Sequence, residues 1–240
     1  MSNPTAAMLV IGDEILSGRT RDANMYYLAG ELAKHGVDLR EVRVVSDDPA
    51  AIIAAVTALS QGHDHVFTSG GIGPTHDDIT ADCIAQAFGV GIDVRDDARA
   101  ILAAHYQKTG TELNAARLRM ARIPDGATLI ENPVSSAPGF TLQNVHVMAG
   151  VPSVFQAMVA SVLATVVGGA PLLSQTLRVD RGEGEIAATL AALADKHPHL
   201  SIGCYPFQVN GAFGANVVVR GTNGAEVDAA VTALARDLEL

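Results

Sequence analysis

A glycine-rich segment at residues 69–78 (SGGIGPTHDD) combines the residue types that bind a phosphate. Three of the four residues at 70–73 are glycines, which let the backbone approach a ligand closely and adopt positive φ angles. Backbone N–H groups at such a turn before a helix attract anions. Asp77 and Asp78 add hard oxygen ligands, through which a divalent cation could bridge to the phosphate. The alternative is a tight turn in which one of these aspartates caps a helix without any ligand.

Two further acidic pairs follow apolar runs that read as strands. Asp13 and Glu14 come directly after one run, and Asp47 and Asp48 come after the next. Because the carboxyl ends of parallel strands meet at one edge of a sheet, where ligands bind, these acids are expected to converge on the glycine segment. For Asp48 we expect helix capping instead, because Pro49 fits the first position of a helix.

Two other segments could complete a site at that edge. Residues 132–140 (NPVSSAPGF) form a loop with serine hydroxyls and a rigid Pro-Gly turn. Residues 149–153 (AGVPS) form a second strand–glycine–helix junction, with Pro152 or Ser153 at the helix start, and offer a second anion-binding N-terminus. A ligand with two phosphate or polar ends would fit between the two junctions.

The elements that must position these motifs alternate between strand and helix. Strands are predicted over 6–11, 37–46, 64–69, 128–130 and 145–149, and helices over 24–35, 49–59, 78–88, 98–108, 112–121 and 152–167. This order indicates a mostly parallel sheet with helices on both faces. The stretch 168–171 (GGAP) reads as a linker, so we expect one domain over 1–170 and another over 172–240. The second is expected to be a small α+β unit with strands over 174–179, 200–204 and 215–220 and helices over 183–195 and 225–237.

Composition narrows the classes of function. The 240 residues are 48% hydrophobic and 18% charged, which is typical of a globular chain. The net charge of −10 and the aromatic content of 4% argue against nucleic-acid partners, and the charge also argues against anionic membranes. Cys83 and Cys204 are isolated, so zinc and iron–sulfur sites are not expected. With no signal peptide or membrane-spanning run, we expect a cytoplasmic protein.

Several blocks of the sequence resemble the CinA family (competence/damage-inducible protein A). They are residues 10–18, 22–24, 27–28, 69–80, 132–134, 137–140 and 150–153, followed by 184–187 and 202–206 in the tail. The resemblance covers essentially the whole chain. It implies a three-layer α/β/α sandwich of the MoaB/Mog type with a mostly parallel sheet, a small α+β second domain, and assembly as a homodimer.

The same resemblance implies a function. The family's N-terminal domain is associated with metal-dependent hydrolysis of ADP-ribose-type pyrophosphates, so a divalent metal (Mg, Mn or Co) and a small phosphorylated ligand, either nucleotide or pterin, are expected. Asp47, Asp77 and Asp78 would be catalytic, with Asp13, Asp47 and Asp78 holding the metal. In the Mog branch, the acids that match Asp47 and Asp78 are important for adenylyl transfer to molybdopterin. Longer members add a nicotinamide-nucleotide deamidase domain, which we expect this chain to lack.

The residues expected to bind the ligand surround the three strand ends. They are Gly12, Asp13, Glu14, Ser17, Gly18, Asp22, Asn24, Ser69, Gly70, Gly71, Gly73, Pro74, Thr75, Ser136, Pro138, Gly139, Gly150, Pro152 and Ser153. Two alternatives to a pyrophosphatase remain open. One is a molybdopterin adenylyltransferase-like step in molybdenum cofactor biosynthesis, and the other is a nucleotide-binding regulator without catalysis.

Overall fold

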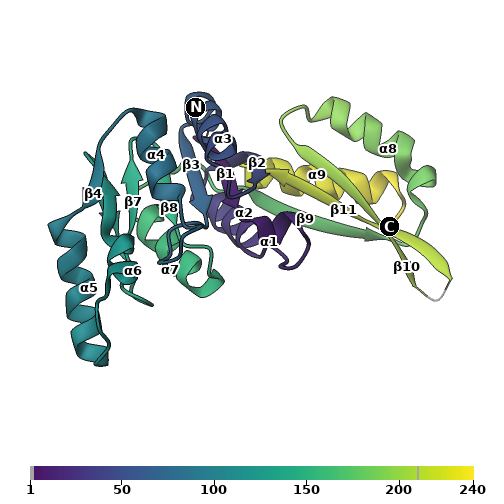
Figure 1. Cartoon of the computed structure of the whole chain (residues 1–240). Helices are drawn as coiled ribbons and strands as arrows, with labels where there is room; N and C mark the ends of the chain where they lie inside the picture. Colours follow the sequence, from purple (N-terminus) through teal and green to yellow (C-terminus); the bar gives the residue numbers. More distant parts are fainter. Residues whose placement is uncertain (1–2, 210) are drawn as a thin grey trace. The chain divides into compact units, whose positions relative to one another are not determined.

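The computed structural model describes residues 3–209 and 211–240, and the chain divides into two compact units, Met1–Gly169 and Ala170–Leu240 (Figure 1). The apolar side chains support this division. Two hydrophobic clusters are built only from residues of the first unit, and a third cluster only from residues of the second. Each unit therefore has a core of its own.

The first unit is built around a six-stranded sheet with strand order β2-β1-β3-β8-β7-β6. Neighbours among β2, β1, β3 and β8 pair in parallel, whereas β7 and β6 continue the sheet in antiparallel pairing. The mostly parallel sheet is thus confirmed. The strands are β1 (Thr5–Ile11), β2 (Asp38–Val45), β3 (His65–Ser69), β6 (Thr128–Ile130), β7 (Gly139–Leu142) and β8 (Val145–Met148).

Helices cover both faces of this sheet. Alternate residues of β1 divide between two cores, because successive side chains of a strand point to opposite faces. Ala6, Met8 and Val10 pack with α2 (Asn24–His35) and α7 (Pro152–Leu163), and the intervening residues pack with α3 (Pro49–Gly62), α4 (Thr80–Phe88) and α5 (Asp96–Thr109). The predicted three-layer α/β/α sandwich is confirmed.

Local signals explain several helix boundaries. The Asp48 side chain accepts a hydrogen bond from the Ala51 N–H group at 2.8 Å, and Pro49 is the first residue of α3, so the predicted cap is confirmed. The helix predicted over 78–88 begins instead at Thr80. The Asp78 carboxylate bonds back to Thr75 and so closes the preceding loop rather than capping α4.

The segment after α5 departs furthest from the prediction. A helix was predicted over 112–121, but only α6 (Ala115–Leu118) and the 3-10 turn η1 (Arg119–Ala121) form there, starting at Asn114, whose side chain caps α6. A two-stranded antiparallel ribbon, β4 (Ile92–Val94) with β5 (Arg122–Pro124), was not predicted. Both strands have three residues, too few to show a period. The short helix α1 (Asp13–Leu16) follows β1.

The second unit has the predicted order of strands and helices. Its elements are β9 (Leu173–Val179), α8 (Glu183–Lys196), β10 (Ser201–Val209), β11 (Ala212–Gly221) and α9 (Gly224–Asp237), with an antiparallel sheet of order β10-β11-β9. Strands β10 and β11 form a longer hairpin than expected. In residues 3–209 and 211–240, no helix has the length and hydropathy needed to cross a bilayer.

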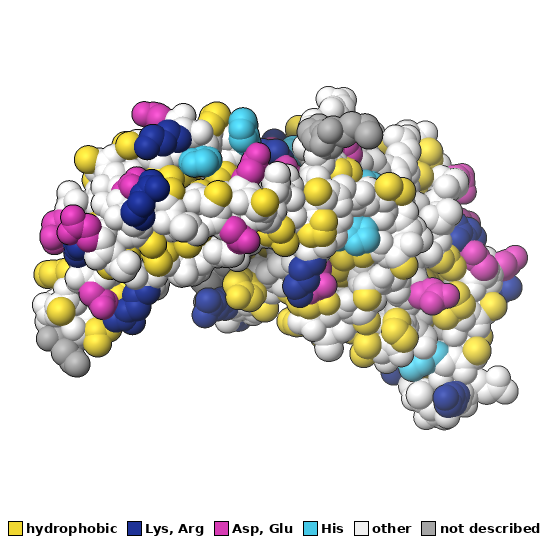
Figure 2. All heavy atoms as spheres, turned by 180° about the vertical axis from the view of Figure 1, so that it is seen from behind, with side chains coloured by type: hydrophobic (Ala, Val, Ile, Leu, Met, Phe, Trp, Pro, Cys, Tyr) yellow, Lys and Arg dark blue, Asp and Glu magenta, His cyan; other side chains and the backbone are white. Residues whose placement is uncertain are grey.

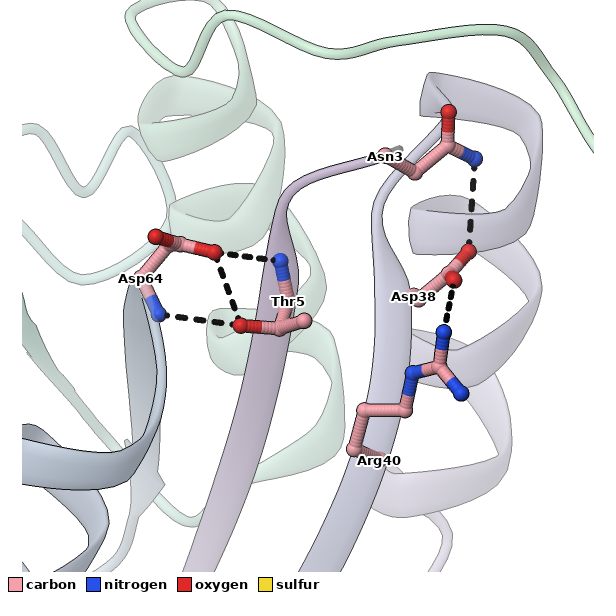
Figure 3. A network of polar contacts seen from close by, with 5 residues as sticks. All are labelled: Asn3, Thr5, Asp38, Arg40 and Asp64. Carbon is pink, nitrogen blue, oxygen red and sulfur yellow. Dashed lines mark hydrogen bonds and ion pairs between the residues drawn. The ribbon is translucent and has the colours of Figure 1, made fainter. Parts of the chain in front are cut away.

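Polar contacts hold the amino ends of the parallel strands together (Figure 3). The N–H and hydroxyl groups of Thr5 both donate to the Asp64 carboxylate, at 2.8 and 2.7 Å, just before β3 begins. These bonds keep the pKa of Asp64 below its usual value. On the other side of β1, Asp38 accepts from Asn3 and pairs with Arg40. The opposite, carboxyl edge of the sheet is left for loops.

At that carboxyl edge, the strand ends approach so closely that Gly70 has no room for a side chain. Its φ is +110°, and a Cβ atom would lie 2.3 Å from the carbonyl oxygen of Ile11. Gly150, after β8, packs against the Cα atom of Gly70, where a Cβ would stand at 3.3 Å. The ends of β1, β3 and β8 are therefore in direct backbone contact.

Substitution of Gly70 by alanine tests this packing. We expect Gly70→Ala to lower the free energy of unfolding by about 2 kcal/mol or more, because it adds both strain at positive φ and overpacking. The matched control is Gly30→Ala, at an exposed position within α2 where a Cβ meets no atom within 4 Å. That variant should gain roughly 0.5–1 kcal/mol in urea unfolding. Similar small effects at both glycines would contradict the described strand packing.

Buried His146, which contacts His65, predicts how stability depends on pH. His146 in β8 contacts His65 Nδ1 and Thr141 Oγ1, and burial lowers its pKa to about 4, with the nearby His65 adding to the effect. Between pH 6.5 and 4 this histidine is protonated in the unfolded chain but neutral in the folded chain. Its contribution to the free energy of unfolding is therefore fully present above pH 6.5 and is lost progressively as the pH falls. From pH 7 to 5 we expect a loss of about 2 kcal/mol from this group.

Denaturant unfolding at the two pH values measures the loss. Acid also protonates carboxylates, so the effect of His146 is taken as the difference from His146→Gln, which should be less stable at pH 7 but less sensitive to acid. The exposed His199→Gln serves as control and should follow the wild type. Equal acid sensitivity of wild type and His146→Gln would disprove the assignment.

Candidate functional site

A cavity of about 800 Å³ opens at the carboxyl edge of the six-stranded sheet. Segments that follow four different strands supply its wall. They are Ile11, Gly12 and Glu14 at the end of β1, Asp47 after β2, residues 70–73 with Asp77 and Asp78 after β3, and residues 149–154 after β8, together with parts of the 132–137 loop. The predicted convergence of Asp47 and the glycine segment at one edge is confirmed. A concave site at this edge is where open α/β sheets bind ligands.

The glycine segment lines this cavity with unpaired backbone donors. The Gly70 N–H group donates to Met148 and so continues the sheet, and the Thr80 N–H group donates to the carbonyl of Gly71. In the described part of the chain, the N–H groups of Gly71, Ile72 and Gly73 find no acceptor. Gly71 holds the turn at φ +69°, where a Cβ would lie 2.1 Å from the Thr80 hydroxyl. Consecutive free N–H groups of this kind form an anion-binding nest.

Acidic groups gather on one side of the cavity. The half-buried Asp47 carboxylate accepts a hydrogen bond from the Asp13 N–H group at 3.0 Å. Burial raises the pKa of Asp47, and the nearby carboxylates of Asp13, Glu14 and Asp77 raise it further, whereas the Asp13 hydrogen bond opposes the shift. The site thus collects negative charge that a cation or a ligand's donors would relieve.

Asp78 is fixed next to the glycine segment. Its carboxylate accepts from the Thr75 N–H group at 2.8 Å and the Thr75 hydroxyl at 2.5 Å. It stands so close to Gly73 that a Cβ there would lie 2.6 Å from Asp78 Oδ2. Asp78 therefore braces the loop while keeping a place on the cavity wall, so the structural and the functional interpretation are compatible.

Buried Asn132 shapes the loop across the cavity. Its side chain accepts from the N–H groups of Val134 and Ser135 and donates to the Ser135 hydroxyl and the Ala137 carbonyl, all within 3.1 Å. Ser136 then adopts a left-handed conformation with φ +63°. One asparagine thus supplies the hydrogen bonds that hold this loop in shape.

The structure brings many of the predicted ligand-binding residues together. On the wall of the main cavity lie Gly12, Glu14, Asp47, Gly70, Gly71, Gly73, Asp77, Asp78, Gly150, Pro152 and Ser153. Asp22, Asn24 and Ser69 line a smaller adjoining pocket of about 60 Å³, which shares Glu14 and Gly150 with the main cavity. There the Asn24 amide donates to Ser69 and Gly150, which leaves its Oδ1 atom buried without a partner in the described residues.

Other predicted residues lie elsewhere. Asp13 does not line the cavity, and its backbone N–H group donates to the Asp47 carboxylate. Thr75 does not line it either, and its N–H group donates to the Asp78 carboxylate. Ser17 ends α1 at an exposed position, Gly18 follows it, and Pro74 is exposed beside the cavity. Ser136 and Pro138 line a separate hollow of about 290 Å³. Gly139 is buried in β7, where a Cβ would lie 2.3 Å from the carbonyl oxygen of Val147, so it serves strand pairing.

The expected metal ligands do not form a complete set. Among residues 3–209 and 211–240, no group of three or more His, Cys, Asp or Glu side chains is placed to hold a metal ion, and this includes Asp13, Asp47 and Asp78. The oxygen donors on the cavity wall nevertheless suit a hard cation of the Mg²⁺ type, which protein carboxylates bind in ones or twos, with substrate phosphates completing the coordination. A metal would therefore fit here together with a phosphorylated ligand, held by Asp47 and Asp78.

Sequence reasoning missed several wall residues. Asn132 was placed in the predicted 132–140 loop without being named as a site residue. Arg119 and Met120 were assigned to the helix predicted over 112–121, although both lie beside the glycine segment. Arg119 donates to the Asp78 carbonyl at 3.3 Å. The sequence feature that could have identified Arg119 is the basic stretch at 117–122 (RLRMAR) in an otherwise acidic chain. Figure 2 shows that acidic, basic and apolar side chains are interspersed on the face it presents, without a continuous basic patch.

Comparison with known proteins agrees with this architecture. The family described as the probable molybdopterin binding domain matches residues 7–172, and the FAD synthase middle domain matches residues 171–240. A crystal structure of the protein CinA from Thermoplasma acidophilum, of unknown function, is 34% identical and superposes with a TM-score of 0.63 over 68% of this chain and 99% of that chain.

Curated relatives match along nearly the whole chain. A CinA-like protein of Geobacter metallireducens is 33% identical over 96% of this chain and 57% of its own length. A probable FAD synthase of Caenorhabditis elegans is 32% identical over 96% of this chain and 49% of its own length. This chain thus spans about half the length of these relatives. It belongs to the family of the probable molybdopterin binding domain, as a relative of the CinA-like proteins with a second domain of the FAD synthase middle type.

Proposed function

We propose that the protein is a divalent-metal-dependent pyrophosphatase that hydrolyses nucleoside diphosphate-linked substrates of the ADP-ribose kind. The observation that carries this proposal is the row of three unpaired N–H groups at residues 71–73 on the wall of an 800 Å³ cavity that also exposes carboxylates. The N–H groups suit a phosphate. The carboxylates suit the cation and the proton transfer that cleavage of a phosphoanhydride requires.

The chain's own groups would divide the work as follows. The N–H groups of residues 71–73 bind the departing phosphate, and Asp78 keeps that loop in shape. Asp47 and Asp78 would hold the divalent cation, and Asp77, on the same cavity wall, would accept a proton from the attacking water. The water oxygen bonds to one phosphorus while the bridging oxygen leaves with the other phosphate. A divalent cation held by Asp47 and Asp78 would supply positive charge that stabilises the phosphoryl oxygens.

A second candidate uses the same cavity for adenylyl transfer to molybdopterin. It is favoured by the family match over residues 7–172. The acceptor would then be a pterin phosphate instead of water, and the nucleotide would be the donor. Incubation with ADP-ribose and Mg²⁺, Mn²⁺ or Co²⁺ separates the candidates, because only a pyrophosphatase releases AMP and ribose phosphate from that substrate. Binding of nucleotide without turnover of either substrate would instead indicate a regulator.

A pair of substitutions tests the role of Asp78 against simple capping. Asp78→Asn keeps the size and an acceptor for Thr75 but removes the charge, so its melting temperature should change little. Its ADP-ribose turnover should fall about 10²-fold or more, equivalent to ~2.7 kcal/mol of transition-state stabilisation. Asp48→Asn is the matched control. It caps α3, and asparagine caps about as well as aspartate, so its rate should match the wild type.

Both variants are measured under saturating metal, with their melting temperatures recorded in the same buffer. Small and equal rate effects at the two positions would show that the acidic loop is scaffolding and that a binding function describes the site better.

A further inference from the structure

The guanidinium of Arg119, beside the glycine segment, has no assigned role. Lys and Arg are absent from the described wall of the main cavity, which carries Glu14, Asp47, Asp77 and Asp78. Arg119 and Arg122 line a small hollow behind the loop, and this hollow shares Gly71, Gly73 and Asp78 with the cavity. A phosphate entering this acidic site meets repulsion that neutral N–H groups offset only in part.

The two arginines differ in their ion-pair and hydrogen-bond partners. Arg122 is paired with the Asp82 carboxylate, so its charge is already balanced, although its Nε atom is also buried and unpaired. Arg119 has no carboxylate partner in the described chain, and its single hydrogen bond, from Nη2 to the Asp78 carbonyl, is long at 3.3 Å. Its Nε atom is buried and unpaired. The Nε–H donor of this guanidinium is therefore buried without an acceptor, which is costly unless an acceptor arrives.

The volumes of the small hollow and the main cavity determine where that acceptor can lie. The hollow of about 20 Å³ admits roughly one water molecule, so it is too small for a phosphate group. The main cavity, at about 800 Å³, has room for a nucleotide. An anion that Arg119 binds must then lie in the main cavity. Arg119 does not line that cavity, so its side chain would have to turn toward the wall that the two spaces share, where Met120 is part of both linings.

We propose that Arg119 binds the second phosphate of a diphosphate ligand whose first phosphate lies on the N–H groups of residues 71–73. This inference rests on the proposed function and extends it, since it makes Arg119 the residue that distinguishes diphosphates from monophosphates. The planar guanidinium can donate two parallel hydrogen bonds to one phosphate, which a neutral loop cannot.

Calorimetric binding of four probes, with and without Mg²⁺, tests the inference. The probes are ADP and inorganic pyrophosphate, with AMP and inorganic phosphate as their monophosphate counterparts. Arg119→Gln should weaken binding of the two diphosphates by about 10- to 100-fold, as expected for charge-assisted hydrogen bonds, and of the two monophosphates by less than about 3-fold. Arg119→Lys retains the charge and should keep more of the diphosphate preference.

The control is Arg117→Gln, two residues earlier in the same segment. The Arg117 guanidinium lies over the Tyr106 ring at 5.0 Å and donates to the Glu112 carbonyl, so its removal should leave all four affinities unchanged. If Arg119 only braced the loop through Asp78, Arg119→Gln would weaken monophosphates and diphosphates by the same factor. That result, or no change for any probe, would overturn the inference.

The design separates this inference from the proposed function. A wild type that binds pyrophosphate in an Arg119-dependent way, but neither binds ADP nor hydrolyses ADP-ribose, contradicts the proposed function and leaves the role of Arg119 standing. A wild type that binds no diphosphate overturns both.

Discussion

The close backbone contact between Gly70 and the carbonyl oxygen of Ile11 is the constraint on which the site depends. It exists because β1 and β3 are adjacent parallel strands that end together, and the turn after β3 can leave the sheet only at positive φ. After that departure the N–H groups of the next three residues have no acceptor in the described chain, and these residues line the cavity. Gly150 packs against Gly70, so the end of β8 and the start of α7 lie beside the same turn.

The carboxylates on the cavity wall determine how the site can bind a phosphate. The chain carries a net charge of −10, and several of its carboxylates lie together on the cavity wall. Such a site cannot attract phosphates by its overall field. It must hold them by short-range donors, by the guanidinium of Arg119, and by a cation that the ligand helps to coordinate. The raised pKa of Asp47 follows from the same crowding of acids.

Sequence reasoning succeeded where the signals were local and strong. The Asp48 cap and the continuous apolar run of β1 each identified an element, and the order of elements gave a parallel sheet with its acids at one edge. It failed where tertiary contacts decide. Asp78 resembles a helix cap in sequence, yet its carboxylate is drawn to Thr75. The positions of Arg119 and Met120 beside the glycine segment depend on how residues 115–124 pack beside α4, which no local period encodes.

The most direct test of the account is a titration of the assigned backbone amide NMR spectrum with ADP in the presence of Mg²⁺. We expect the signals of Gly71, Ile72 and Gly73 to move together along one saturable curve as their unpaired N–H groups gain a phosphate acceptor. The Gly62 signal, at the end of α3 next to the opposite edge of the sheet, should stay in place. Binding of ADP by calorimetry without any shift at residues 71–73 would contradict the claim that this loop holds the phosphate.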